Sequence, residues 1–242
     1  MIKFFRKIRQ KMLTENKFSK YLIYAIGEII LVVIGILIAL SINNWNENKI
    51  LAKKEITNLK EIKINLKSDL ENQLIPGSEY YQRSLDSYDI LLSNFYNSPQ
   101  SIPEDSIRRL FLRMVLPWKF VLNTVAFDNL NSMGIDLISN DSIRENISQL
   151  YGYKYKIILN YHNVTVTEFR EDFVPLLSNN VNIHKILSKS ELDYLKNKIE
   201  INSRLRGMVY RRQFLRNYFL EVKPIVERLI VDIETEIERM EN

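Results

Sequence analysis

The feature that most constrains this chain is an apolar run from Tyr21 to Ile42, placed directly behind a basic N-terminus. A helix needs about 20 residues to cross the hydrocarbon core of a bilayer, so this run is long enough to span a membrane. A cleaved signal peptide is the alternative, but its apolar region would span only about 7–15 residues and end in small residues. We therefore predict a transmembrane helix over residues 21–42.

The distribution of charge gives this helix an orientation. The chain has 242 residues and a formal net charge of +5. Residues 1–20 contain seven Lys or Arg side chains and one Glu, so the remaining residues carry a net charge of −1. Basic side chains beside a span stay on the cytoplasmic side. We expect residues 1–20 to form a basic amphipathic segment on inner-leaflet lipid, with residues beyond the span in the periplasm. The near-neutral body argues against nucleic acid as a partner.

Three residues within the predicted span are candidates for contact with a partner helix. Glu28 is an acid within an apolar run, and such residues are rare and often functional. A protonated or snorkelling Glu28, reaching Lys20 or Lys17, is the alternative interpretation. Gly35 and Ala39 form a small-xxx-small pair that lets two helices approach closely.

The same region resembles a known family. The segments that carry the resemblance are Tyr24–Ile29, Val33–Leu40, Asn43–Glu47 and a second patch over Asn123–Leu130 continuing through Gly134 to Ile138. They are similar to a bacterial family of uncharacterised single-pass membrane proteins, typical of Bacteroidota, that is labelled only as a domain of unknown function. The resemblance implies an inner-membrane protein with a helical body in the periplasm, and it implies no activity.

Beyond the span, apolar residues recur at steps of three and four, which indicates helices. One such stripe consists of Ala52, Ile56, Leu59, Ile62, Leu66, Leu70 and Leu74, and a second of Val222, Val226, Leu229, Ile233, Ile237 and Met240. We predict an all-α fold: a single N-terminal transmembrane helix that continues into a helical stalk over 43–75, followed by an antiparallel helical bundle over 76–242.

Prolines and capping residues predict the helix boundaries. We expect the first long helix to break at Pro76, and another helix to end near Phe173, before Pro175. Capping boxes are expected at Ser101 with Glu104 and at Ser188 with Glu191. Thr124 and Asn140 are expected as N-caps, and Gly134 as a helix end. Pro224 is expected to kink the last helix or restart it.

The sequence shows no constellation that specifies a chemistry. It contains no cysteine, and its two histidines, His162 and His184, have no second ligand at metal spacing. The acidic groups Asp69 with Glu71, Glu168 with Glu171 and Asp172, and Glu234 with Glu236 and Glu238 are interpreted as solvated helix faces or partners for Arg. We therefore expect no catalytic residues, no metal and no cofactor, and the protein is not expected to be an enzyme.

The most distinctive feature beyond the predicted span is a group of arginines that alternate with aromatic residues. The arginines are Arg204, Arg206, Arg211, Arg212 and Arg216. They are interpreted either as ion-pair partners of Glu168, Glu171 and Asp172, or as a site for an anionic ligand. Because Arg206 lies beside Leu205 and Val209, we expect it to form a partly buried ion pair.

Two functions fit these observations. The first is a non-enzymatic interaction or scaffold module that is tethered to the inner membrane and binds another envelope protein or a second copy of itself. The second is a ligand-sensing module that signals through a partner protein, because the predicted cytoplasmic part is too short to hold an output domain. A closed Arg-lined cavity would favour sensing, whereas a filled apolar core with an exposed apolar stripe would favour a scaffold.

Overall fold

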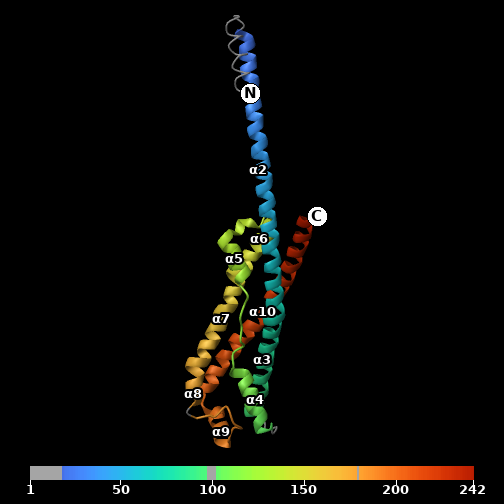
Figure 1. The fold of residues 1–242 in the computed structure, drawn as a ribbon. Helices are drawn as coiled ribbons and strands as arrows, with labels where there is room; N and C mark the ends of the chain where they lie inside the picture. The colour runs from blue at the N-terminus through green and yellow to red at the C-terminus, as the bar shows by residue number, and fades with distance from the viewer. Residues whose placement is uncertain (1–17, 97–101, 179) are drawn as a thin grey trace. The chain divides into compact units, whose positions relative to one another are not determined.

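The computed structural model describes residues 18–96, 102–178 and 180–242 (Figure 1). These residues contain helices, turns and irregular segments but no strand, which confirms the all-α prediction. In chain order the helical elements are α2 (Phe18–Asp69), η1 (Leu70–Leu74), α3 (Ile75–Tyr96), α4 (Glu104–Val115), α5 (Val125–Met133), η2 (Ile135–Leu137), α6 (Asp141–Gln149), η3 (Leu150–Lys154), α7 (Tyr155–Thr167), η4 (Glu168–Phe173), α8 (Val174–Ser178), α9 (Lys189–Asn197) and α10 (Ile199–Glu241). The chain divides into two compact units, residues 1–54 and 55–242. Most of the predicted amphipathic segment, as well as Ser101, lies outside the described residues.

The first unit is described from Phe18 onward and consists of the N-terminal part of α2. Among the described residues, one helix is long and apolar enough to cross a membrane, with a mean hydropathy of 2.8 over its most apolar window. None of that window is buried in the protein. At the end of the apolar run, the Asn43 side chain donates a hydrogen bond to Glu47 over 2.8 Å. Lys49 Nζ lies 5.3 Å from the centre of the Trp45 ring.

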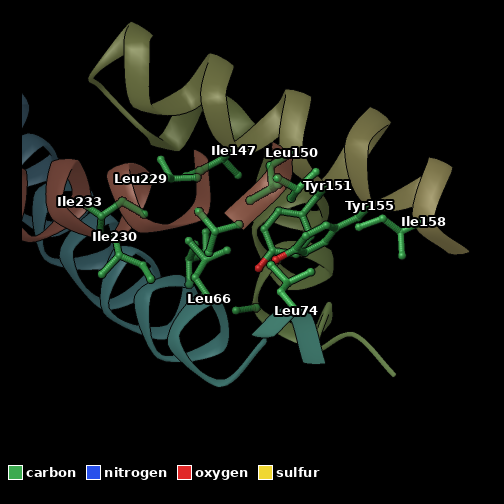
Figure 2. Packing of buried hydrophobic residues seen from close by; sticks show 14 of the residues in the cluster. Leu66, Leu74, Ile147, Leu150, Tyr151, Tyr155, Ile158, Leu229, Ile230 and Ile233 are labelled. Atoms are coloured by element: carbon green, nitrogen blue, oxygen red, sulfur yellow. The ribbon is translucent and has the colours of Figure 1, made fainter. Parts of the chain in front are cut away.

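The second unit has a filled apolar core built from the two predicted stripes. Leu59, Ile62 and Leu66 of α2 are fully buried and belong to the same cluster as Val222, Val226, Leu229, Ile233 and Ile237 of α10. Buried residues of α6, η3 and α7 belong to it as well, and Figure 2 shows Ile147 close to Leu229. The chain runs in opposite directions in α3 and α10 (Figure 1), as expected for an antiparallel bundle. The two stripes therefore stabilise the unit by packing in its core, and they do not form an exposed apolar surface.

A second apolar cluster fills the other part of this unit. It joins Phe111 and Met114 of α4 with Phe173, Leu195 and Met208, together with neighbouring residues of α3, α8 and the loop before α9. The rings of Phe111 and Phe173 are 6.3 Å apart between centres. This cluster attaches α4 and α9 to the N-terminal half of α10.

The helices do not break at Pro76 or Pro175, which corrects two predictions. In both places a π-turn comes first: η1 ends two residues before Pro76, and η4 ends two residues before Pro175. The residue just before each proline donates its N–H five residues back, from Ile75 to Leu70 O and from Val174 to Phe169 O. A proline normally disrupts a helix because it lacks an N–H and clashes with the carbonyl four residues earlier. The wider turn shifts the hydrogen-bond ladder just before the proline, so the helix continues. Pro224 lies inside α10 without ending it.

The predicted caps have mixed outcomes. Asn140 caps α6 by accepting hydrogen bonds from the backbone N–H groups of Ser142 and Ile143, and Ser188 with Glu191 forms the expected capping box. Gly134 ends α5 with a φ of 100°, a conformation that favours glycine. The expected cap before α4 is wrong, since Pro103 occupies the N-cap position without a side-chain bond. Thr124 is at the N-cap of α5, but its hydroxyl donates to Asp128 instead. The box at Ser188 opens only α9, because Lys198 interrupts the helix before α10.

Candidate functional site

The five arginines that alternate with aromatic residues all lie on α10, but they have different surroundings and do not form one site. Arg204 pairs with Asp172 over 2.9 Å, and the Arg211 guanidinium makes a two-pronged contact with Glu168. These are the carboxylates that the sequence indicated as partners. Within residues 18–96, 102–178 and 180–242, Arg206 and Arg216 make local hydrogen bonds alone, to Asn202 O and to the Asn217 side chain. The expected partly buried pair at Arg206 is wrong, because Arg206 is exposed.

Arg212 is the buried member of this group, with no exposed surface. Its guanidinium donates to the Ser84 hydroxyl over 2.6 Å and to the carbonyl oxygens of Leu116 and Arg113 over 2.9 and 3.5 Å. Arg113 and Leu116 lie at the C-terminal end of α4, where helix carbonyls lack helical partners and the helix dipole favours a cation. Burial lowers the pKa of Arg212 from its usual value, while the nearby tyrosines and Glu168 oppose that shift. Arg212 therefore joins α10 to α3 and α4.

An open depression of about 430 Å³ lies beside the Arg211–Glu168 pair. Asn160, Asn163 and Thr167 line it together with both members of the pair. Since the guanidinium and the carboxylate already satisfy each other there, the depression offers an incoming anion no free cation. The geometry gives the anionic-ligand interpretation no support at this position.

The most unusual polar group in this unit is Asp69, the last residue of α2. Only 1% of its surface is exposed, although the sequence interpretation placed it on a solvated face with Glu71. That interpretation is wrong for Asp69, and Glu71 is exposed as expected. Among the described residues no cation lies within ion-pair distance of the Asp69 carboxylate. A buried carboxylate without a cation is costly unless hydrogen bonds satisfy it.

Two structural elements provide the polar groups around Asp69. The backbone N–H of Asn123, in the irregular segment between α4 and α5, donates to Asp69 Oδ1 over 2.9 Å. The second element is η3 with the start of α7, which contributes Tyr151 and Tyr155. Figure 2 shows the two hydroxyl oxygens side by side, directed toward the helix that contains Leu66 and Leu74. The rings are 5.1 Å apart between centres, edge to face, and Tyr151 stacks on Phe127 at 4.6 Å.

Three buried oxygens of this group make no hydrogen bond of normal geometry to any residue that the structure describes: Asp69 Oδ2 and the hydroxyls of Tyr151 and Tyr155. Burial raises the pKa of Asp69 to about 6, although the Asn123 N–H and the nearby Tyr155 hydroxyl act in the opposite direction. Burial and the Asp69 charge both raise the pKa of Tyr155 above its usual range. We call Asp69, Tyr151 and Tyr155 the Asp69 centre. Its chemistry is that of a proton-binding group buried in the core.

The backbone around the Asp69 centre is also unusual. Asp69 directly precedes the π-turn η1, Tyr151 lies within the π-turn η3, and Tyr155 directly follows η3. Such turns are rare and occur frequently at functional sites. One turn beyond Asp69, the Gln73 side chain accepts a hydrogen bond from the N–H of Val121 over 3.1 Å. Asp69 and Gln73 thus hold the same irregular segment.

Two other buried acids differ from Asp69 because they have several partners. Glu55 accepts from the backbone N–H and the hydroxyl of Ser139 over 2.8 and 2.9 Å. Glu236 accepts from Arg239 and from the Asn140 side chain, and the hydrogen bond from Arg239 lowers its pKa. These carboxylates fix the turn at 138–141 to α2 and α10.

The remaining candidates lie apart from the Asp69 centre. Glu28, Gly35 and Ala39 lie on α2 in the first unit, where a side chain added at Gly35 would meet open space. Their contact with a partner helix stays a prediction. His162 is buried against Phe120, with ring centres 5.8 Å apart, and burial lowers its pKa. The described residues contain no group of His, Cys, Asp and Glu side chains that could hold a metal ion.

Comparison with known proteins adds a family but no activity. No curated protein and no solved structure matches the chain. The model of a family of unknown function, DUF6090, matches residues 28–199, which is more than half of the chain. The match begins within the apolar segment and includes Asp69, Tyr151 and Tyr155. The protein therefore belongs to the DUF6090 family, whose function is unknown.

Proposed function

We propose that this protein is a single-pass inner-membrane protein whose second unit is a periplasmic interaction module. The observation that carries the anchor is the apolar segment of α2, in which none of the most apolar window is buried in the protein. Large aliphatic side chains such as Ile23, Leu31 and Leu37 expose more than half of their surface in the protein alone. Burying one such side chain is worth about 1.5–3 kcal/mol, so a series of them requires an apolar surrounding such as lipid. The basic residues before the segment support a cytoplasmic N-terminus.

Carbonate extraction and protease protection test the anchor and its orientation. We expect the full-length protein to stay with membranes in carbonate, and protease added to spheroplasts to digest residues 55–242. Replacement of Leu31 and Val32 by Lys, with Lys60→Glu as a charge-changing control, should release only the first variant. Extraction of the wild-type protein by carbonate would contradict the anchor, whereas full protection of the second unit would contradict the orientation.

The interaction role is supported by a row of aromatic side chains on α10 and α7. Tyr210, Phe214 and Tyr218 follow one another at steps of four, and Tyr161 stacks on Phe214 with ring centres 4.0 Å apart. Tyr210 exposes 72% of its surface. Tyr, Phe and Arg are enriched at protein interfaces relative to the rest of a surface. We propose that this row contacts another envelope protein or a second copy of the chain, and that the role is not catalytic.

A photo-crosslinking residue at position 210 in the full-length protein tests this surface in native membranes. We expect a crosslinked species that is absent when the same residue replaces Glu71, which is exposed on another helix. Coexpression of two differently tagged copies shows whether the captured chain is a second copy or a different protein. Identical patterns from both positions, or no product from position 210, would contradict the proposed surface.

The Asp69 centre favours a second candidate function, which is sensing. Asp69 ends α2, the helix that begins in the apolar segment, so a change at Asp69 acts on that helix directly. An anion-binding sensor has less support, because Arg204 and Arg211 are paired with carboxylates and Arg212 is buried. Signalling would still need a partner protein, and Glu28 is the candidate contact. Replacing Glu28 with Leu should then change the set of crosslinked partners. An unchanged set would remove this residue from the proposal.

A further inference from the structure

Asp69 can bond to its surroundings in two ways, and its protonation state decides between them. As an ion it is an acceptor only, so it accepts from the Asn123 N–H, and the Tyr155 hydroxyl is close enough to donate to it. As a neutral acid its second oxygen becomes a donor, and the nearby hydroxyl oxygen of Tyr155 can accept from it. Asp69 Oδ2 and the Tyr155 hydroxyl, which make no normal hydrogen bond to the described residues, are thus the atoms whose roles change with the proton.

The elements packed around Asp69 contribute few other titratable groups. From η3 and α7 these are Tyr151 and Tyr155, and from α5 it is Asp128, which acts on Tyr151. The segment before α5 contributes the neutral N–H of Asn123. The part of α10 from Phe219 to Val226 buries only apolar side chains. In the part of the chain that the structure describes, no basic group pairs with Asp69, so a proton is the simplest partner that can neutralise its charge.

We propose that Asp69, Tyr151 and Tyr155 form a proton-operated switch that sets how firmly η1, the segment 117–124 and η3 are held together. Each of the three parts is connected to the centre: η1 directly follows Asp69, the segment donates the Asn123 N–H to Asp69, and η3 contains Tyr151. Protonation neutralises the buried charge and favours the closed arrangement. Ionisation favours opening, because an open arrangement returns the carboxylate to water. This switch requires neither membrane anchoring nor a partner protein.

The sign follows from the pKa. The pKa of Asp69 is raised from 3.8 to about 6 in the folded protein, so the stabilisation by its proton is complete below pH 3.8 and is lost as the pH rises through 6. Because of the difference between these two pKa values, the equilibrium constant for opening should be roughly 25-fold larger at pH 7.5 than at pH 4.5. A group with a lowered pKa, such as Glu236, has the opposite dependence and weakens the structure only in acid.

Hydrogen exchange of the full-length protein in lipid nanodiscs tests the switch. After correction for the intrinsic pH dependence of exchange, amides of residues 70–75, 119–124 and 150–155 should lose roughly 25-fold in protection between pH 4.5 and 7.5. Amides of α9, which pack in the other cluster, serve as the internal reference. In Asp69→Asn the dependence should disappear, whereas the matched control Asp128→Asn should retain it.

Two results would overturn the proposal: flat protection in the wild-type protein, or a dependence that survives in Asp69→Asn. If Asp69→Asn does not fold, Tyr155→Phe replaces it as the decisive variant. This change keeps the carboxyl group and removes a hydroxyl that lowers the pKa of Asp69, so the midpoint of the exchange transition should move above 6. An unchanged midpoint in Tyr155→Phe would then exclude the Asp69 centre as the origin of the transition.

Discussion

Arg212 and Asp69 are both ionisable side chains buried in the helical unit, and their surroundings differ in one respect. Arg212 donates to a hydroxyl and to two carbonyl oxygens at the end of α4, although its Nε has no hydrogen-bond partner among the described residues. Asp69 has one conventional hydrogen bond and an oxygen without any. The arginine is always protonated in practice, whereas the carboxyl group titrates near pH 6. The charge of Arg212 is therefore constant and joins the helices at every ordinary pH, whereas the charge of Asp69 changes with pH.

The largest expected effect is that of Arg212→Met. It removes three hydrogen bonds from a guanidinium and leaves carbonyl oxygens of Arg113 and Leu116 with fewer partners. Hydrogen bonds to charged groups contribute about 1.5–3 kcal/mol each, and an unsatisfied buried group costs about 1–3 kcal/mol. We expect a loss of roughly 2–4 kcal/mol in the free energy of unfolding, after subtracting the relief from removing a buried charge. Denaturant unfolding in detergent micelles, followed by circular dichroism, measures it.

Arg212→Lys is the matched variant for that measurement. The ammonium keeps the charge, but it cannot span Ser84 and two carbonyls with the geometry of a planar guanidinium. Its unfolding free energy should therefore lie between those of the wild type and Arg212→Met. If Arg212→Met were as stable as the wild type or more stable, burying the charge would cost more free energy than its hydrogen bonds contribute.

Asp69→Asn should differ from the wild type mainly in pH dependence. The free energy of unfolding of the wild type, relative to this variant, should fall by about 2 kcal/mol between pH 4.5 and 7.5. Using the difference between the two proteins removes the contributions of Glu234 and Glu236, whose lowered pKa values have the opposite sign. A constant difference across this range would show that Asp69 does not titrate there.

The two tyrosines of the Asp69 centre should differ in their influence on the pKa of Asp69. This effect is smaller than the preceding ones. Tyr155 acts on the pKa of Asp69, whereas Tyr151 is not among the groups that do. Tyr155→Phe should therefore raise the midpoint of Asp69 above 6, and Tyr151→Phe should leave it in place. A carboxyl titration followed by infrared absorption in each variant makes this comparison. If both variants had the same midpoint, the Tyr155 hydroxyl would have no effect on the pKa of Asp69.

The smallest expected effect concerns the Arg204–Asp172 pair, both of whose side chains are partly exposed. Exposed pairs contribute about 0.2–1 kcal/mol, and salt weakens them. Asp172→Asn should cost no more than this in denaturant unfolding, with the difference shrinking at high salt. A loss comparable to that of Arg212→Met would show that the surface pairs of α10 matter as much as its buried arginine.

The sequence predicted the fold well because helical periodicity depends on local spacing. The stripe from Ile56 to Leu74 and the stripe from Val222 to Met240 were both identified, and they face one core. The helix ends at Pro76 and Pro175 were wrong, since a π-turn depends on tertiary packing and has no simple sequence signal. The same packing decided that Arg212 is buried and Arg206 exposed, although they lie close together on one helix.

The Asp69 centre was missed, but the sequence does contain a signal for it. Asp69 continues the spacing of Leu59, Ile62 and Leu66, which places a carboxylate on the buried face of α2. An acid at such a position should have been assigned to the core and not paired with its exposed neighbour Glu71. The contributions of Asn123, Tyr151 and Tyr155 could not be predicted, because they come from segments more than fifty residues away.

The titration of the Asp69 carboxyl group tests the central claim most directly. Full-length protein labelled with ¹³C at aspartate carboxyl carbons would be followed by nuclear magnetic resonance between pH 3.5 and 8. The Asp69 signal is assigned by its loss in Asp69→Asn. We expect a midpoint near 6, well above the ordinary aspartate value of 3.8. A midpoint at or below 4 would contradict it, because the carboxylate would then be as well accommodated in the core as in water.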